Sequence, residues 1–323
     1  MKNARHTVSS LFAATAGALL CAGIAKPATA KDISVVGITV GSLGNPYFAA
    51  TDKGIADKAK QITPNAKIDI VSSDYDLNKQ FTQIDNFIAA GAEVIMVNAS
   101  DPVAIAPAIM KAKKAGIAVG AFDVTAEGAD ITVMTDNVKA GEESCQYIVD
   151  HLPNKTGDVV IVNGPQVSSI VDRVKGCEAV LKANPGITIL SDKQNAQASR
   201  DGGFAVGQNL LTRYPKIDAI FAINDPTAIG VDLAAKQQNR HEFFITSVDG
   251  APDIIPEIKN KDGLIKASAA QDPYDMAAEA YAYAVDVANG KAPPSKVVLL
   301  NPTLITIDNI NSYKGWDPTQ AAR

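Results

Sequence analysis

Short apolar runs alternate with segments of helical period through most of the chain, and this alternation limits the possible folds more than any other feature. The runs ISVVGITV, AKIDIVSS, AEVIMVNAS and IAVGAFD begin at residues 33, 66, 92 and 117, and Gly, Pro, Asn or Asp bounds each one. In the segment 77–91, apolar side chains recur every three or four residues, and Gly91 stands where a helix C-cap is favoured. Apolar strands linked by helices predict a parallel sheet that is covered on both faces.

The pattern starts again after residue 137, so the chain carries two successive blocks of similar size. The apolar runs of the second block are GDVVIVNG, ITILSD, DAIFAIND and FFITSVDG, which begin at residues 157, 187, 218 and 243. Helical segments separate these runs, and no low-complexity stretch interrupts either block. The sequence therefore predicts an α/β protein with two similar, doubly wound parallel-sheet lobes.

The first thirty residues differ from the rest of the chain. Two basic residues precede the apolar run LFAATAGALLCAGIA, and the small residues ATA end at Ala30. We predict that residues 1–30 are a signal peptide cleaved after Ala30. An uncleaved membrane anchor is disfavoured because the apolar run is short for a span. A lipoprotein signal is disfavoured because Leu20 stands directly before Cys21, where such signals carry a small residue.

Composition and cysteine count indicate which binding partners and which cellular compartment to expect. The chain has 323 residues, of which 46% are apolar, and this suffices for two medium-sized cores. A net charge of -5 without a long basic run gives no electrostatic footprint for nucleic acid, so we expect no nucleic-acid partner. Export to an oxidising compartment favours a disulfide between Cys145 and Cys177, and two buried small thiols are the alternative.

Polar side chains follow the predicted strands at the points where the strands end. Open parallel sheets bind ligands outside the carboxyl ends of their strands, so these side chains are candidates for one site. Amides and carboxylates suit the hydroxyl groups of a sugar, although each residue could instead cap a helix or make a turn. The residues at these ends are Asn45, Asn98, Asp123, Asn224, Asp249 and Gln271.

Two rings and one guanidinium complete the candidate site. Tyr47 and Phe48 follow Pro46 in the first turn of a predicted helix, and rings in this position would cover the C–H face of a sugar. The alternative is that Phe48 packs into the lobe while Tyr47 lies on the surface. Arg173 follows the GPQVSS segment and would donate to two oxygens and neutralise a nearby Asp, or else form a surface ion pair.

Short motifs run through the chain in a fixed order: GNPYF, VNASD, FD, TDN, DRVKG, FAIND, SVDGAPD and AAQDP. In this order they resemble the periplasmic sugar-binding proteins of ribose type, which serve ABC importers. The resemblance covers essentially the whole mature chain. It implies the type I fold, with a ligand in the cleft between two lobes joined by a three-crossing hinge. The lobes would comprise residues 31–134 plus 273–299 and residues 135–272 plus 300–323.

The resemblance also assigns roles to residues. In that family the asparagine and both aromatics of the first motif contact sugar, and these are Asn45, Tyr47 and Phe48 here. The other contacts would fall on Asn98, Asp123, Arg173, Asn224, Asp249 and Gln271. The hinge crossings would lie near Thr135, Gln271 and Leu300. The implied partners are a sugar or polyol ligand and a membrane permease, and we expect a monomer located in the periplasm.

Two positions depart from the ribose-binding pattern. Val124 follows Asp123 where ribose binders carry an arginine, and NAQAS before Arg200 contains no aromatic residue where they carry one. We therefore expect a pentose, a ketose or a related polyol rather than ribose in particular. The alternative function is an exported ligand-sensing subunit that presents bound sugar to a chemoreceptor or sensor kinase.

Other classes of protein fit the sequence less well. The glycines at 37, 41 and 44 do not have the G-x-G-x-x-G spacing of a dinucleotide-binding turn. The chain has no G-x-S-x-G, and its three histidines are too dispersed for a zinc site. A sugar-responsive repressor would begin with a helix-turn-helix rather than a signal peptide. We therefore predict no catalytic residue, no metal and no cofactor.

Overall fold

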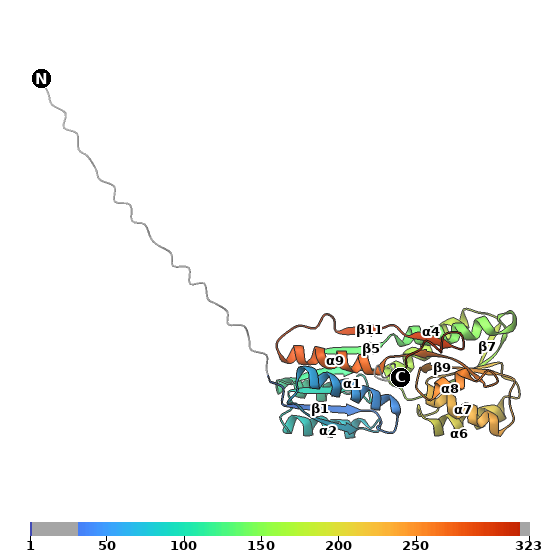
Figure 1. The fold of residues 1–323 in the computed structure, drawn as a ribbon, viewed down its shortest axis with the longest axis horizontal. Helices are drawn as coiled ribbons and strands as arrows, with labels where there is room; N and C mark the ends of the chain where they lie inside the picture. The colour runs from blue at the N-terminus through green and yellow to red at the C-terminus, as the bar shows by residue number, and fades with distance from the viewer. Residues whose placement is uncertain (2–31, 317–323) are drawn as a thin grey trace. The chain divides into compact units, whose positions relative to one another are not determined.

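The computed structural model describes Met1 and residues 32–316. The predicted signal peptide beyond its first residue, Cys21 included, and residues 317–323 of the second predicted lobe lie outside the described residues. The described chain forms two six-stranded sheets, each with helices on both faces, so the predicted two-lobe α/β fold is confirmed (Figure 1). No helix within residues 32–316 is long and apolar enough to cross a membrane.

The first sheet contains β1 (Val35–Val40), β2 (Lys67–Ser72), β3 (Val94–Val97), β4 (Ala118–Phe122), β5 (Ile131–Thr135) and β11 (Val297–Leu300). The strands lie in the order β11-β5-β4-β3-β1-β2, and all neighbours pair in parallel. Every residue of β3, β4 and β5 is buried, which explains their unbroken apolar sequences. The carboxyl ends of β1, β3 and β4 therefore lie at one edge of this sheet.

The second sheet contains β6 (Gly157–Asn163), β7 (Ile187–Asn195), β8 (Ala219–Ala222), β9 (Phe244–Asp249), β10 (Ile265–Ala270) and β12 (Thr303–Thr306). Its order is β12-β10-β9-β8-β6-β7. β12 pairs antiparallel with β10, so this edge differs from the rest of the sheet, in which neighbouring strands pair in parallel. The reason is where the strand enters: β12 starts at Thr303 beside the carboxyl end of β10, and it runs back along that strand.

Helices cover both faces of each sheet. On the first sheet, α1 (Pro46–Ile62) packs with α9 (Pro273–Ala288), and α2 (Leu77–Ala89) packs with α3 (Ala106–Lys114). On the second sheet, α4 (Asn137–His151) packs with α5 (Ser168–Lys182), and the short helix η1 (Pro153–Lys155) follows α4. α6 (Arg200–Arg213) packs with α7 (Asp225–Gln237), while α8 (Ile254–Lys259) lies against β10. Figure 1 shows α9 beside α1, although more than 200 residues separate the two helices in sequence.

An Asn or Asp side chain caps the start of α1, α2, α4, α7 and α9. These caps accept backbone N–H groups that the first turn of a helix leaves without partners. The capping residues are Asn45, Asp76, Asp136, Asn224 and Asp272. Since most of these helices begin where a strand has just ended, the caps place polar side chains near the carboxyl edges of the sheets.

α4 and α5 are in unusually close contact. A Cβ atom added at Gly141 or at Gly176 would lie 2.0 Å from a backbone oxygen of the other helix, so both positions require glycine. Cys145 and Cys177 form a disulfide between the same two helices. This tight pair fixes the position of Arg173, whose own backbone oxygen is the atom that approaches Gly141.

Three chain crossings join the two sheets and lie next to one another. They connect β5 to α4, β10 to α9 and β11 to β12. The Thr135 hydroxyl donates to Gln271 Oε1 at 2.8 Å, and the Asp136 amide donates to the Leu300 carbonyl at 2.8 Å. The crossings thus lie at Thr135, Gln271 and Leu300, where the sequence places the hinge, and hydrogen bonds tie them into one unit.

A two-walled cavity at the strand ends

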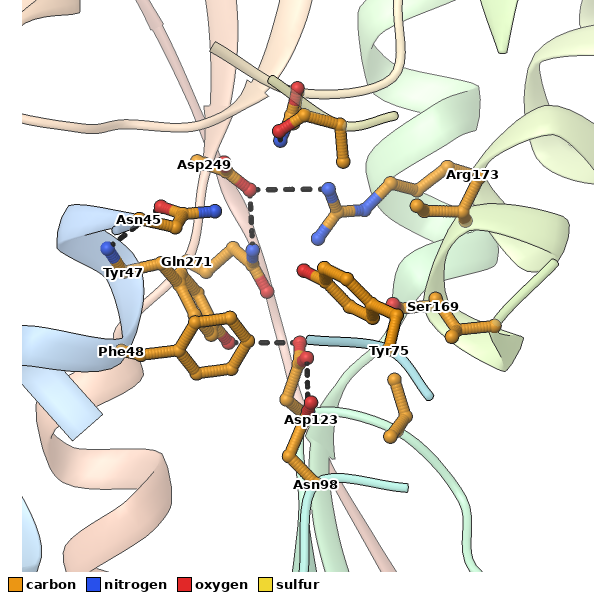
Figure 2. Close-up of a pocket in the computed structure, with 15 residues that line it drawn as sticks. Asn45, Tyr47, Phe48, Tyr75, Asn98, Asp123, Ser169, Arg173, Asp249 and Gln271 are labelled. Atoms are coloured by element: carbon orange, nitrogen blue, oxygen red, sulfur yellow. Dashed lines mark hydrogen bonds and ion pairs between the residues drawn. The ribbon is translucent and has the colours of Figure 1, made fainter. Parts of the chain in front are cut away.

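One cavity lies where the carboxyl ends of strands from both sheets face each other, and Figure 2 shows its lining. All nine residues predicted from the sequence line it, so the structure brings the whole predicted set together. Their contact with a ligand stays a prediction. The lining residues are Asn45, Tyr47, Phe48, Tyr75, Asn98, Asp123, Val124, Val167, Ser169, Ile170, Arg173, Ala198, Asn224, Asp249 and Gln271.

The size of the cavity limits what it can hold. Its volume for the centres of water-sized molecules is about 40 Å³. A sphere of that volume has a radius of about 2.1 Å, and adding the roughly 1.4 Å radius of water gives a cavity radius of about 3.5 Å. This space is comparable with one monosaccharide ring.

The first lobe contributes two rings from the start of α1. Asn45 Oδ1 accepts the Tyr47 amide at 3.0 Å and Pro46 occupies the first helical position, which fixes how the chain enters the helix. The Tyr47 and Phe48 rings meet edge to face, with centroids 5.5 Å apart. Tyr47 is only 4% exposed, so the alternative of a surface Tyr47 is wrong. Both rings line the cavity.

Asp123 and Asn98 form the polar part of the first wall. Asp123 Oδ1 accepts the Tyr47 hydroxyl at 3.0 Å, and Asp123 Oδ2 accepts Asn98 Nδ2 at 2.8 Å. Burial raises the pKa of Asp123, even though Arg173 and these two donors act in the opposite direction. Among residues 32–316, no cation forms an ion pair with Asp123. Its φ of 67° is a strained value for a residue other than glycine, as is common at functional sites.

Arg173 organises the second wall. Its Nε donates to Asn137 Oδ1 at 2.9 Å, and its Nη1 donates to the Ile223 carbonyl at 2.8 Å and to Asp249 Oδ1 at 3.1 Å. The side chains of Arg173 and Asp249 are each 5% exposed, so the alternative of a surface ion pair is wrong. A buried guanidinium held at three points is rigid, and the rest of its planar fork faces the cavity (Figure 2).

Asp249 connects the second wall to the hinge. Its Oδ1 also accepts Gln271 Nε2 at 2.7 Å, and Gln271 Oε1 in turn accepts the Thr135 hydroxyl. Burial raises the pKa of Asp249 to about 6, against the lowering effect of Arg173 and Gln271. Asp249 has a φ of 132°, a second strained backbone in the site. A ligand that binds Asp249 would therefore act on a chain of bonds that reaches two hinge crossings.

Two neighbouring polar residues at the start of α7 complete the second wall and its support. Asn224 caps α7 by accepting the Thr227 amide at 3.1 Å, so its predicted alternative role as a helix cap is confirmed, and it also lines the cavity. The neighbouring Asp225 is fully buried and accepts the hydroxyls of two serines and the Ala251 amide. Burial, and then the nearby Asp249, raises the pKa of Asp225 to about 8.

The sequence analysis missed Tyr75 and Trp316. Tyr75 lines the cavity from the turn between β2 and α2; a ring just after a strand end was a signal for it. Trp316 lies behind the first wall: its ring meets Tyr47 edge to face at 5.6 Å, and its Nε1 donates to the Asp249 carbonyl at 2.8 Å. No sequence pattern pointed to Trp316, because residues 307–316 lack any periodicity.

The arrangement suits binding of a compact polyhydroxyl molecule. Aromatic rings line the cavity together with carboxylate, amide and guanidinium groups, which supply both hydrogen-bond donors and acceptors. The fold and the cavity together define a class of proteins with two α/β lobes, three crossings and one small-ligand cleft between the lobes.

The chain belongs to the periplasmic binding protein family, because residues 36–292 match the periplasmic binding protein domain. A ribose import binding protein of Bacillus subtilis (strain 168) is 32% identical over 287 residues, which cover 87% of this chain and 91% of that protein. A xylitol-binding protein of Mycolicibacterium smegmatis is 29% identical over 248 residues, covering 76% and 70%. The crystal structure of a Caulobacter myo-inositol binding protein bound to myo-inositol has a TM-score of 0.79 and 28% identity, covering 88% and 96%. The family predicted from the ordered motifs is confirmed.

Proposed function

We propose that this protein captures one molecule of a pentose, a ketose or a related polyol between its lobes in the periplasm and delivers it to the permease of an ABC importer. The observation that carries the proposal is the cavity itself. Its size suits one monosaccharide, and its two carboxylates, four amides and one guanidinium all come from the predicted set. Unpaired polar groups in a closed cleft are costly, so a ligand that pairs them all is strongly selected.

The three adjacent crossings support a hinge mechanism. A ligand that touches both walls favours the state in which the lobes approach, by its higher affinity for that state. The backbone amide of Thr125 in the first lobe donates to Ser168 Oγ in the second at 2.8 Å, a contact that opening of the cleft must break. The permease would then recognise the closed shape.

Relatives of this chain support transport rather than signalling or catalysis. The names of the ribose import and xylitol-binding relatives refer to uptake and binding of polyhydroxyl compounds. They give no support to presentation of the ligand to a chemoreceptor or sensor kinase. We propose that the protein has no catalytic activity and acts as a monomer after cleavage behind Ala30.

Ligand screening on the mature protein tests the proposal. Pentoses, ketoses, xylitol and myo-inositol are added singly, and we expect at least one to raise the melting temperature and to bind in calorimetry. Asp249→Ala should abolish the shift. Asp286→Asn serves as the matched control, since its exposed ion pair with Lys291 lies outside the cavity. Failure of every polyhydroxyl compound to bind would refute the proposal.

Small-angle scattering tests the closing motion separately. With the best ligand at saturation, we expect the mature protein to become more compact while its circular dichroism stays the same. Unchanged dimensions with bound ligand would contradict the hinge mechanism and leave sugar binding intact.

A further inference from the structure

Tyr75 has an unusual backbone for a bulky residue. It has a φ of 58°, directly after Asp74 with a φ of 53°, and such values are rare outside glycine and asparagine. Local bonds hold this turn: Asp74 accepts the Ser72 hydroxyl and pairs with Lys79, each at 2.6 Å. The Tyr75 amide also donates to the Gly41 carbonyl at 3.2 Å. A strained turn kept by several bonds points to a role for the side chain that it aims.

The Tyr75 ring reaches the cavity across the end of β1. A Cβ atom added at Gly41 would lie 2.5 Å from Cε1 of this ring, so glycine is needed there to let the ring pass. In Figure 2 the rings of Phe48 and Tyr75 lie on either side of Asp123. The lining residues of the second lobe include no ring, so Tyr75 is the aromatic surface on its side of the cavity.

Tyr75 also forms the boundary between two cavities. A second cavity of about 470 Å³ lies outward of the first, lined by residues such as Pro46, Arg200 and Ile229. Three residues line both cavities: Asn45, Tyr75 and, from the opposite lobe, Ala198. Because Ala198 is small, the Tyr75 ring makes up most of the side-chain bulk at this boundary.

The Tyr75 hydroxyl is available to a ligand. Within residues 32–316 it has no hydrogen-bond partner, whereas the Tyr47 hydroxyl donates to Asp123. It lies among Asp123, Asp249 and Arg173, and burial raises the pKa of Tyr75, so it keeps its proton. A phenol in this position offers one donor and one acceptor to a ligand that the charged groups also contact.

We infer that Tyr75 sets the size limit of the site: its ring closes the inner cavity against the outer one, and its hydroxyl binds the ligand. This inference rests on the proposed function. A single monosaccharide or polyol fits inside the boundary. A ligand that carries a substituent toward the outer cavity meets the Tyr75 ring, and it is rejected although ample space lies beyond.

Calorimetry on variants of Tyr75 tests the inference. The probes are D-ribose, xylitol and myo-inositol, each beside a form enlarged by one O-methyl group. For the wild type we expect the enlarged form of the best probe to bind at least tenfold more weakly. Tyr75→Ala should reduce that discrimination at least tenfold, whereas Tyr75→Phe should keep it and weaken the small probe severalfold. Tyr75→Asn provides a second ringless variant, since asparagine tolerates the positive φ of this turn.

Tyr283→Phe is the matched control for loss of a phenol hydroxyl, because Tyr283 bonds Glu279 on α9 and lies outside both cavities. It should behave as the wild type. Folded ringless variants that keep the wild-type ratio would overturn the inference while the proposed function stands. A wild-type protein that binds no polyhydroxyl compound would overturn both.

Discussion

Three aromatic rings line the first wall of the cavity, and none lines the second. The first wall also holds Asp123 without an ion-pair partner among residues 32–316, whereas Asp249 of the second wall pairs with the buried Arg173. The walls come from lobes with the same strand order and the same doubly wound layering. Similar architectures therefore present unlike chemistry, because the difference lies in a few residues beyond the strand ends.

This contrast suggests that the two walls contribute differently to ligand capture. Apolar contact with a ring face is not directional, so the first wall can hold a sugar before its hydroxyls are aligned. The second wall offers charged hydrogen bonds that demand fixed geometry, and Asp249 and Gln271 join it to the hinge. Under the proposed function, the second wall is thus the one whose contacts would favour closure.

Removal of the cation in the second wall should have the largest effect. Arg173→Met leaves the buried Asp249 with its Gln271 hydrogen bond but without a cation, and breaking a buried ion pair costs about 3–5 kcal/mol of unfolding free energy. The matched change in the first wall, Asp123→Asn, should cost less than about 1.5 kcal/mol, since an amide still pairs with Tyr47 and Asn98. Urea unfolding at neutral pH measures both. Equal losses would erase the contrast between the walls.

The next largest effect is expected from loss of the disulfide, which should affect the second lobe and not the first. It joins α4 to α5 in the second lobe, so reduction or a double Cys145→Ala, Cys177→Ala change should lower stability by about 2–4 kcal/mol. Hydrogen exchange should rise in α4 and α5 and stay unchanged in α1 and α2. Mass spectrometry of the unreduced protein should show a mass two hydrogens lower than that of the dithiol. Two thiols open to alkylation in the native protein would end this prediction.

The rings should contribute to binding by burial alone. Tyr47→Ala and Phe48→Ala are each expected to weaken sugar binding by about 1–3 kcal/mol through lost apolar contact. Asp249→Ala should weaken binding at least as much, because it leaves ligand hydroxyls unpaired in the cleft. Calorimetry on folded variants decides the matter. Wild-type affinity in both ring variants would mean that Tyr47 and Phe48 only form the well-capped start of α1 and do not contact the sugar.

A small pH effect should arise behind the second wall. The pKa of Asp225 is raised from its usual value to about 8, so the neutral form favours the folded state. Its stabilising effect is complete below the unfolded pKa and is lost as the pH rises through about 8. Between pH 7 and 8 the unfolding free energy should fall by about 1 kcal/mol from this group. Thermal melts of Asp225→Asn should not show this fall in unfolding free energy. A pH profile identical to that of the wild type would contradict the raised pKa of Asp225.

Much of this molecule follows from the sequence because parallel strands share one carboxyl edge. Six polar strand-end residues could be placed in one site without knowing any distance. The two rings and Arg173 could be added from the predicted helices, and the ordered motifs then supported their roles. Tyr75 escaped prediction because its place in the cavity depends on two successive left-handed residues and on the space above Gly41. Neither is visible in a hydrophobic pattern.

The edge strands show a different limit. β11 and β12 have only four residues each and are half exposed, so they lack the buried runs that mark central strands such as β3, β4 and β8. The pairing of β11 and β12 depends on where the chain crosses between the sheets at Leu300. This position is set by the tertiary structure. Trp316 could not be predicted for the same reason, since only the folding of the segment after β12 brings it beside Tyr47.

Trp316 is also the only tryptophan in the chain. Its indole touches a ring of the first lobe and a backbone carbonyl of the second, so a change at the cleft alters its surroundings directly. The protein therefore carries its own optical reporter, whose emission originates at one known position without any label. Excitation of this single fluorophore would follow capture and release in real time, in the unmodified molecule and at micromolar concentration or below.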